Sequence, residues 1–229
     1  MKKFLLGLVA AVAAGTSFGA TVNVTSTGNY TTIQNYTNCT TVPASLCANF
    51  LTTHNVSGSF TTAGALPANA ANLEIGSTVT SYSFSNGLDT VASTDTNARL
   101  NTLRISTDAS GNITSVNVMQ IVLWQSGTAP HTAGNRFAAF VVAGTNGTST
   151  HNSSCATTGT GNSGVTDTCL TATVTDTSRS TGNNSPVSVS MAVAPVATTA
   201  AIPTVSEWGL ILMASLLGMF GIARLRRQR

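Results

Sequence analysis

The chain has 229 residues, a formal net charge of +3 and only 7% charged residues, whereas soluble globular domains usually carry roughly a quarter. Threonine, serine and asparagine together account for 83 residues, more than a third of the chain. This composition excludes a typical cytosolic enzyme, which keeps a charged surface for solubility. It also excludes a typical disordered chain, which is charged or rich in proline.

The positive charge belongs to the two ends of the chain. Residues 1–20 carry +2 and residues 202–229 carry +3, whereas residues 21–201 carry −2. The central region therefore offers no basic patch, and nucleic acid is not an expected partner.

The first 20 residues have the three parts of a secretory signal peptide. A basic start, Met1–Lys3, is followed by an apolar run, Phe4–Ala14, and then by mostly small residues. As a helix the run would rise only about 17 Å, too little for a hydrocarbon core of about 30 Å. We expect export through the Sec translocon and cleavage after Gly19 or Ala20.

The C-terminal end is typical of a membrane helix with a basic stop. The segment Trp208–Ala223 contains no charge, and as a helix it would cover about 24 Å. Four arginines follow it: Arg224, Arg226, Arg227 and Arg229. By the positive-inside rule this tail stays in the cytoplasm. Residues 21–201 are therefore expected on the outer side of the inner membrane.

A short signature precedes and opens this helix. It consists of Ile202, Pro203, Thr204, Val205, Trp208 and Gly209. With the helix and the arginine end, residues 202–229 closely resemble the IPTL-CTERM protein-sorting domain of Gram-negative bacteria, although Val205 stands where the family usually has leucine. The resemblance implies processing by an exosortase, a membrane-embedded cysteine transpeptidase. It also implies a final place at the cell surface or in the extracellular matrix, in systems that export exopolysaccharide.

The residues before the helix suit a processing site. Pro203 cannot extend a helix toward its N-terminal side, and it biases Ile202 to an extended backbone. Proteases bind extended segments, and residues 196–201 form a linker that keeps the signature accessible. The chain is therefore interpreted as the substrate, with the nucleophile supplied by the sorting enzyme.

Residues 21–195 are expected to form a mainly β domain, an antiparallel β-sandwich. The clearest element is a hairpin with arms Arg99–Thr107 and Asn112–Trp124, because Asp108 opens and Gly111 closes a four-residue turn. The second arm is apolar on both faces near its end, which indicates a central strand. Further strands are expected at Val22–Ser26, Val56–Thr62, Ser77–Ser85, Arg136–Ala143, Cys169–Asp176 and Val187–Val193.

The four cysteines of an exported chain favour disulfides. Among the three possible connectivities, the local pairs Cys39–Cys47 and Cys155–Cys169 are preferred, and each closed loop would contribute about 3 kcal/mol. A zinc site that joins His151 to Cys155 and Cys169 is the alternative, but no C-x-x-C spacing supports it. No metal or other cofactor is expected.

One pattern could belong to a hydrolase. The segment Gly161–Gly164 resembles the nucleophile loop of chymotrypsin-like proteases. His54, followed by Asp89 or Asp95, precedes Ser163 in the order that a Ser–His–Asp triad would need. The residues around His54 and Ser163 have simple loop composition, however, so no catalytic residue is expected.

Three functions remain open for the central domain. The leading hypothesis is a non-enzymatic surface or matrix protein, and the second is a secreted hydrolase delivered by the same tail. The third is a carbohydrate-binding module, which would need exposed aromatic side chains. The candidates for such a platform are Tyr30, Tyr36, Tyr82 and Trp124.

Overall fold

In the computed structural model, the described part of the chain comprises residues 19–193, 209, 211–217, 219 and 224. The chain divides into two compact units, residues 1–194 and residues 195–229. Several predicted features lie outside the described residues: the signal peptide up to residue 18, the linker 196–201, the signature residues Ile202, Pro203, Thr204, Val205 and Trp208, and Arg226, Arg227 and Arg229.

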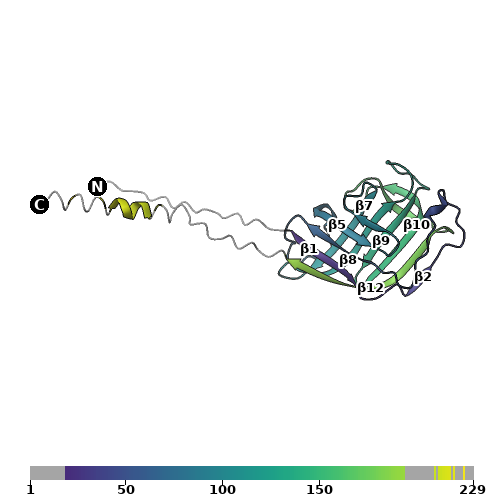
Figure 1. Ribbon diagram of the computed structural model, residues 1–229, viewed down its shortest axis with the longest axis horizontal. Coiled ribbons are helices and arrows are strands. Elements are labelled where there is room, and N and C mark those ends of the chain that lie inside the picture. The colour runs from purple at the N-terminus through teal and green to yellow at the C-terminus, as the bar shows by residue number, and fades with distance from the viewer. Residues whose placement is uncertain (1–18, 194–208, 210, 218, 220–223, 225–229) are drawn as a thin grey trace. The chain divides into compact units, whose positions relative to one another are not determined.

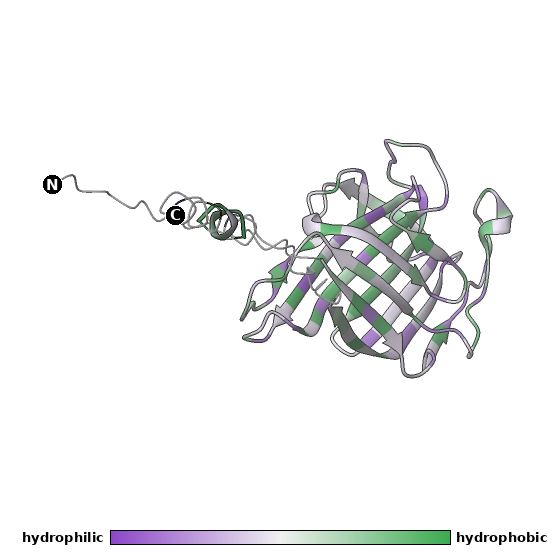
Figure 2. Ribbon diagram, turned by 60° about the vertical axis from the view of Figure 1, so that its left-hand side comes forward, coloured by the Kyte–Doolittle hydropathy of each residue, from purple (hydrophilic) through white to green (hydrophobic). Residues whose placement is uncertain are grey.

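The described part of the first unit consists of strands and loops with two short 3-10 turns (Figure 1). Its elements are β1 (Ala20–Ser26), β2 (Thr32–Gln34), η1 (Ala44–Leu46), β3 (Ser57–Thr62), β4 (Leu73–Glu74), η2 (Gly76–Thr78), β5 (Val79–Ser85), β6 (Thr90–Ala92), β7 (Ala98–Thr107), β8 (Ile113–Trp124), β9 (Arg136–Ala143), β10 (Asn146–Gly159), β11 (Thr168–Ala172) and β12 (Ser180–Val193). Along the long strands, apolar positions alternate with polar ones (Figure 2), as expected for strands with one face in a core.

The strands form one continuous 12-stranded sheet, in the order β4-β7-β8-β9-β10-β12-β1-β3-β5-β6, with β11 paired to β10 and β2 paired to β12. Every pairing in it is antiparallel. The prediction of a mainly β, antiparallel domain is therefore confirmed. The expectation of two separate sheets is replaced by a single sheet whose two halves share β12.

The long strand β12 changes partner midway. Its first half pairs with β10, and its second half pairs with β1, from Val187 opposite Ser26 to Val193 opposite Ala20. Pro186, which has no N–H to donate, stands at the change of partner, and its carbonyl accepts a hydrogen bond from the Thr27 N–H at 2.8 Å. A strand predicted only at Val187–Val193 thus starts seven residues earlier, at Ser180.

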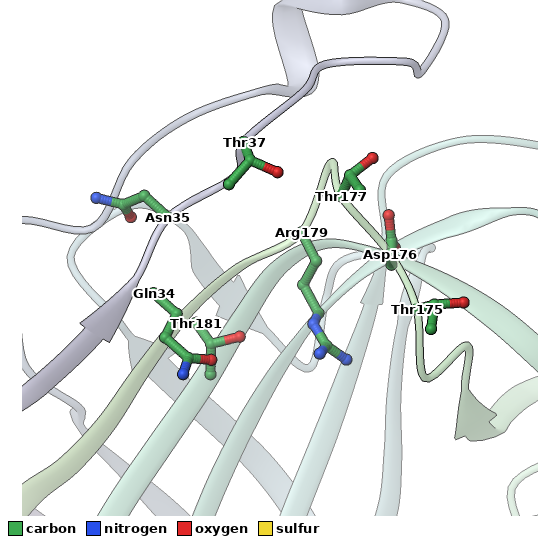
Figure 3. A pocket seen from close by; sticks show the side chains of 8 residues that line it. All are labelled: Gln34, Asn35, Thr37, Thr175, Asp176, Thr177, Arg179 and Thr181. Carbon is green, nitrogen blue, oxygen red and sulfur yellow. The ribbon is translucent and has the colours of Figure 1, made fainter.

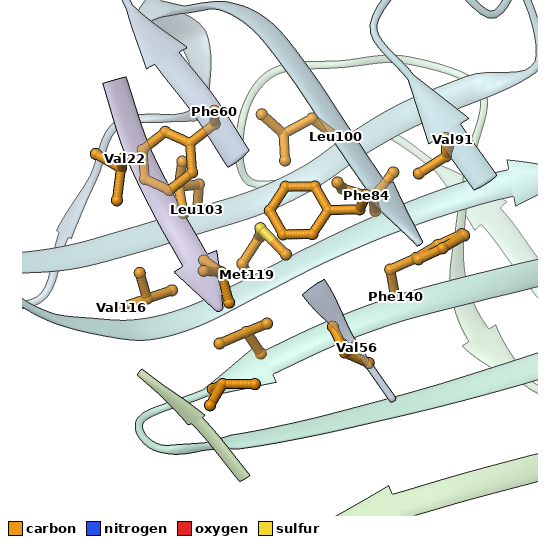
Figure 4. Packing of buried hydrophobic residues seen from close by; sticks show 14 of the residues in the cluster. Val22, Val56, Phe60, Phe84, Val91, Leu100, Leu103, Val116, Met119 and Phe140 are labelled. Atoms are coloured by element: carbon orange, nitrogen blue, oxygen red, sulfur yellow. The ribbon is translucent and has the colours of Figure 1, made fainter. Parts of the chain in front are cut away.

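The main hydrophobic core lies between the two halves of the sheet (Figure 4). One half contributes residues such as Val22, Phe60 and Phe84, and the other contributes residues such as Leu103 and Phe140. All five side chains are 2% exposed or less. Burial of apolar surface on this scale is the principal force that folds the sheet over itself.

A second, smaller cluster covers the opposite face of β8 and β9. It contains Val122, Trp124, Phe137 and Ala139, together with the cysteines of one disulfide. The prediction that the end of β8 is apolar on both faces is therefore confirmed: Met119 and Ile121 enter the main core, while Val122 and Trp124 enter the second cluster.

Both predicted disulfides are present. The Cα atoms of Cys39 and Cys47 are 6.0 Å apart, and those of Cys155 and Cys169 are 5.7 Å apart, within the range that disulfides require. The second bond joins β10 to β11 inside the smaller cluster. Because its thiolates are consumed, the alternative zinc site with His151 is excluded.

The predicted hairpin is confirmed as β7 and β8. Its turn is built by Asp108, whose Oδ1 accepts hydrogen bonds from the N–H groups of Ser110 at 2.8 Å and Asn112 at 2.9 Å. Gly111 has a φ of 81°, which a residue with a side chain rarely adopts. Hydrogen bonds to Asn112, to its side chain foremost, hold the pKa of Asp108 below its usual value.

Besides β12, the strands that differ most from the prediction are β10 and β11, and the sequence does not predict the short strands β2, β4 and β6 either. β10 occupies Asn146–Gly159, where the sequence predicts no strand at all. The strand predicted at Cys169–Asp176 ends at Ala172, and residues 173–179 form a loop that approaches β2 and its following residues. Both differences arise in segments whose buried positions are filled by polar residues.

In the second unit, the described residues 211–217 are helical. Their large apolar side chains are exposed within that unit: Ile211, Leu212, Met213, Leu216 and Leu217. Among the residues that the structure describes, no helix has both the length and the apolarity needed to cross a membrane. The predicted helix 208–223 is thus described only in part.

The first unit should fold without the second, because β12 completes the sheet before residue 194. A chain that lacks residues 195–229 should keep its melting temperature within about 2 °C when unfolding is followed by circular dichroism. A matched truncation that also removes Val187–Ala194 deletes one of the two strands that pair with β1, and it should abolish cooperative unfolding. Equal behaviour of the two truncations would contradict this account.

Candidate functional site

The residues of the possible catalytic triad hold other partners. Ser163 donates its hydroxyl hydrogen to Glu74 Oε1 at 3.2 Å, and Asp89 Oδ2 lies 2.7 Å from Nδ1 of His151. His54 Nδ1 accepts the N–H of Leu51 at 3.3 Å. Among the described residues, no hydrogen bond joins His54 to Ser163 or to either candidate aspartate, Asp89 or Asp95.

Glu74 organises the segment that contains Ser163. Its Oε1 accepts the N–H groups of Leu103 at 2.8 Å and Gly76 at 3.0 Å, and its Oε2 accepts the Thr102 hydroxyl at 2.5 Å. Burial raises the pKa of Glu74, but these hydrogen bonds outweigh burial and hold the pKa below its usual value. The Ser163 hydroxyl therefore helps to stabilise the Glu74 carboxylate, and, among the described residues, it is not hydrogen-bonded to a histidine that could act as its general base.

The most buried charge cluster joins β9, β10 and the loop before β12. Arg136 lies 3.0 Å from Asp176, and the two side chains are only 11% and 6% exposed. Arg136 also donates from Nε to the side-chain oxygen of Asn152 at 2.8 Å, while Asp176 accepts the N–H of Ser154 at 2.7 Å and of Ser178 at 3.1 Å. Both carboxylate oxygens of Asp176, and Nε and Nη2 of Arg136, thus have partners, as burial requires.

A second cluster fixes the loop that follows β8. Asp167 contacts Arg99 at 2.9 Å and His131 Nδ1 at 2.8 Å, and its Oδ1 accepts the His131 N–H at 2.6 Å. The His131 ring stacks on Trp124 with centroids 4.4 Å apart. The indole N–H of Trp124 in turn donates to the Asp167 carbonyl at 2.9 Å. These contacts close the smaller cluster at its edge.

The carboxyl of Asp167 also links stability to pH. Burial raises its pKa, but the hydrogen bonds from His131 and Arg99 together outweigh burial and hold the pKa below its usual value. Its stabilising contribution is therefore present above the pKa of the unfolded chain, and it is lost as the pH falls through the lower folded-state pKa.

A third cluster fastens the first disulfide loop to the sheet. His151 on β10 places Nδ1 near Asp89 and Nε2 2.6 Å from the carbonyl oxygen of Leu46. Gln125 donates to the other oxygen of Asp89 at 3.1 Å. The three clusters lie where β8 ends, β9 begins and β12 starts, so half of the scarce charges of the domain bind the loops at one end of the sheet.

One arginine of the first unit is not used in this way. Arg99, Arg104 and Arg136 each pair with a carboxylate. Arg179, half-buried at the start of β12, has no ion-pair partner among the described residues. Its nearest acid in the chain, Asp176, already pairs with Arg136.

The side chain of Arg179 lines a cavity of about 500 Å³ (Figure 3). The walls come from the end of β2, the residues after it, the loop before β12 and the start of β12: Gln34, Asn35, Thr37, Thr175, Asp176, Thr177 and Thr181. The Thr177 carbonyl accepts the N–H groups of Thr37 at 2.9 Å and Asn38 at 3.2 Å, which holds the two rims together. All of the lining residues are of polar or charged type, although their aliphatic carbons also contribute to the surface of the cavity.

The candidate aromatic platform is not present. Tyr30 and Trp124 are buried, at 4% and 2% exposure, and Tyr36 and Tyr82 are half-buried. In the described residues no aromatic side chain is fully exposed. A flat aromatic surface for sugar stacking is therefore missing from this part of the chain.

The buried Arg136–Asp176 pair should be the most sensitive charged site of the fold. Asp176→Asn leaves Arg136 buried without a counter-charge and should lower the free energy of unfolding by about 3–5 kcal/mol. The control Asp95→Asn alters an exposed carboxylate at a turn and should cost less than about 1 kcal/mol. Urea denaturation measures both, and equal losses would refute the structural role of the pair.

Comparison with known proteins identifies the tail. Residues 200–227 match the IPTL-CTERM motif, which confirms the resemblance. No curated protein and no solved structure matches the chain. The match covers the region that contains Ile202, Pro203, Thr204, Trp208 and Gly209, and it does not extend to the strands. The chain is thus a β-domain protein that ends in an IPTL-CTERM sorting domain.

Proposed function

We propose that this chain is an exported protein of the cell surface or extracellular matrix, held at the inner membrane by its C-terminal helix and then processed by an exosortase. The observation that carries this proposal is the IPTL-CTERM match at residues 200–227. In this role the mature β domain is the part that is delivered to the surface, and the tail is the recognition sequence that the sorting enzyme binds.

The chemistry of the domain supports export. Both disulfides are closed, and disulfides persist in oxidising compartments outside the cytoplasm. The domain also has no lysine, and most of its charges are spent on internal pairs. A surface of hydroxyl and amide groups depends little on ion pairs, so it tolerates varied salt and close contact with polysaccharide.

The apolar sequence of the tail supports an anchor, although the helical residues that the structure describes are too few to span a membrane. Ile211, Leu212 and Leu216, among other apolar side chains, are exposed within their own unit, and such a helix needs an apolar environment. Arg224, Arg226, Arg227 and Arg229 follow it in the sequence and would keep the end of the chain in the cytoplasm. The domain then occupies the periplasm until the sorting step.

The two ends of the domain support processing at one membrane surface. Ala20 and Val193 are paired neighbours on β1 and β12, so the signal peptide before the domain and the sorting tail after it are joined to adjacent positions. The Sec translocon would deliver the chain, and both cleavages would occur at the same pole of the domain.

We assign no catalytic role to the mature domain. Ser163 donates to Glu74 and His54 does not contact Ser163, which disfavours the hydrolase alternative. The buried state of Trp124 and Tyr30 disfavours a carbohydrate-binding module of the aromatic kind. Contact with exopolysaccharide would have to use polar groups.

Sorting predicts a shortened C-terminus. Mature protein from the native cell should lack Trp208–Arg229, because cleavage near Pro203 separates the domain from its helix. Replacement of Pro203 and Thr204 by alanine should leave a larger, membrane-bound form, whereas alanine at Thr198 and Thr199 in the linker region should not. Mass spectrometry of the surface-located protein identifies its C-terminal residue. An intact Arg229 would contradict processing and would mean that the tail is a permanent anchor.

The signal peptide should be removed after Gly19 rather than after Ala20. Ala20 is 6% exposed, belongs to β1, and donates its N–H to the Thr62 hydroxyl at 3.2 Å. N-terminal sequencing of the mature protein should therefore begin at Ala20. A start at Thr21 would show that the first pair of the sheet is dispensable, and an intact Met1 would contradict the signal peptide.

A further inference from the structure

We propose that the cavity around Arg179 binds a carboxylate-bearing sugar, such as a uronic acid residue of an acidic polysaccharide. The inference deepens the polysaccharide contact of the proposed function and rests on it. Its chemistry is that of one guanidinium surrounded by hydroxyl and amide groups.

The charge of Arg179 is the first ground. The carboxylate of Asp176, although it lines the cavity, is already satisfied by Arg136 and by the N–H groups of Ser154 and Ser178. The guanidinium of Arg179 therefore keeps its positive charge and its five N–H donors without an acceptor among the described residues. A planar carboxylate fits that fork with two parallel hydrogen bonds.

The neighbouring side chains are the second ground. Asn35 is occupied, because its amide exchanges hydrogen bonds with the backbone of Phe50 at 2.9 and 3.2 Å. Five other lining side chains make no hydrogen bond to the described residues and remain able to donate and accept: Gln34, Thr37, Thr175, Thr177 and Thr181. Groups of this kind match sugar hydroxyls. A cavity of about 500 Å³ also exceeds the needs of a simple ion.

The place of the cavity in the fold is the third ground. Arg179 immediately precedes β12, whereas the sorting tail follows the last residue of the same strand, Val193. Fourteen residues of extended strand separate the two by on the order of 45 Å. The cavity thus lies at the opposite end of β12 from the residue after which the sorting tail follows in the sequence.

The composition of the cavity also predicts how strongly it binds. Since no aromatic ring lines it, one sugar residue gains little apolar contact, and the affinity of a single site should be low. Many copies on one surface would bind a long polymer far more tightly than a monomer, through a high effective concentration. The carboxylate supplies selectivity over neutral sugars.

The test uses the full-length protein in detergent micelles, with binding measured by calorimetry. Oligogalacturonate is the acidic probe, and galacto-oligosaccharide of the same length is the neutral one. We expect binding of the acidic probe at least tenfold tighter than that of the neutral probe. Arg179→Gln should weaken acidic binding at least tenfold. The control Arg104→Gln, at an arginine of β7 that pairs with Glu74 of β4 and does not line the cavity, should change it less than twofold.

Each other result overturns the assignment. Unchanged binding by a folded Arg179→Gln variant would exclude the cavity, and equal binding of both probes would exclude the carboxylate. If acetate displaces oligogalacturonate as strongly as monomeric galacturonate does, the cavity binds anions in general and does not recognise the sugar. If the protein binds monomeric galacturonate, but its affinity for the oligomer does not rise when the protein is immobilised at high density, the natural ligand would be a free hydroxy acid and not a polymer.

The outcome is separable from that of the sorting proposal. If the tail is removed in the cell and the probes fail to bind, the sorting function stands and the cavity assignment falls. If the probes bind while Arg229 is retained in the mature protein, the cavity assignment stands and the proposal that an exosortase removes the tail is refuted. Melting temperatures of both arginine variants establish that each is folded.

Discussion

The architecture depends on the pairing of β12 with both β10 and β1. The first half of this strand completes the half-sheet that contains β7 to β10, and its second half completes the half-sheet that contains β1, β3, β5 and β6. The hydrogen bonds of one strand therefore hold together the two faces that enclose the main core. The core, the three charge clusters and the position of Arg179 all follow from this shared strand.

The sequence predicts well those elements whose burial is apolar. The arms of the β7–β8 hairpin are found as expected, and β9 spans the predicted residues. β10 escapes prediction because its most buried positions carry Ser149, His151, Asn152 and Ser153, which have no apolar period. Ser149 and Ser153 lie beneath neighbouring strands and loops, and a pattern of hydrophobicity cannot register a polar interior. A register shift between Thr150 and Ser153, where Asn152 has a φ of 54°, further breaks the alternation.

The candidate sites differ in the same way. A motif that is contiguous in the sequence, such as the sorting signature, can be recognised without a structure. The even number of cysteines likewise predicts disulfides without one. The order of His54, Asp89 and Ser163 carried no information, because the spatial partners of these residues are His151 and Glu74 rather than one another. The sequence could not single out Arg179 either. Arg179 differs from the other three arginines of the domain only because each of those three lies close to a carboxylate in the folded structure.

The pairing of Ala20 with Val193 also governs when the domain can fold. β1 is synthesised first and β12 last, so β1 can pair with β3 early but waits for almost the whole domain before β12 is available. Contacts of such long sequence separation close slowly, because the entropy of a large loop must be overcome first. Under the export proposed above, the sheet would be completed only after all of its strands had left the translocation channel.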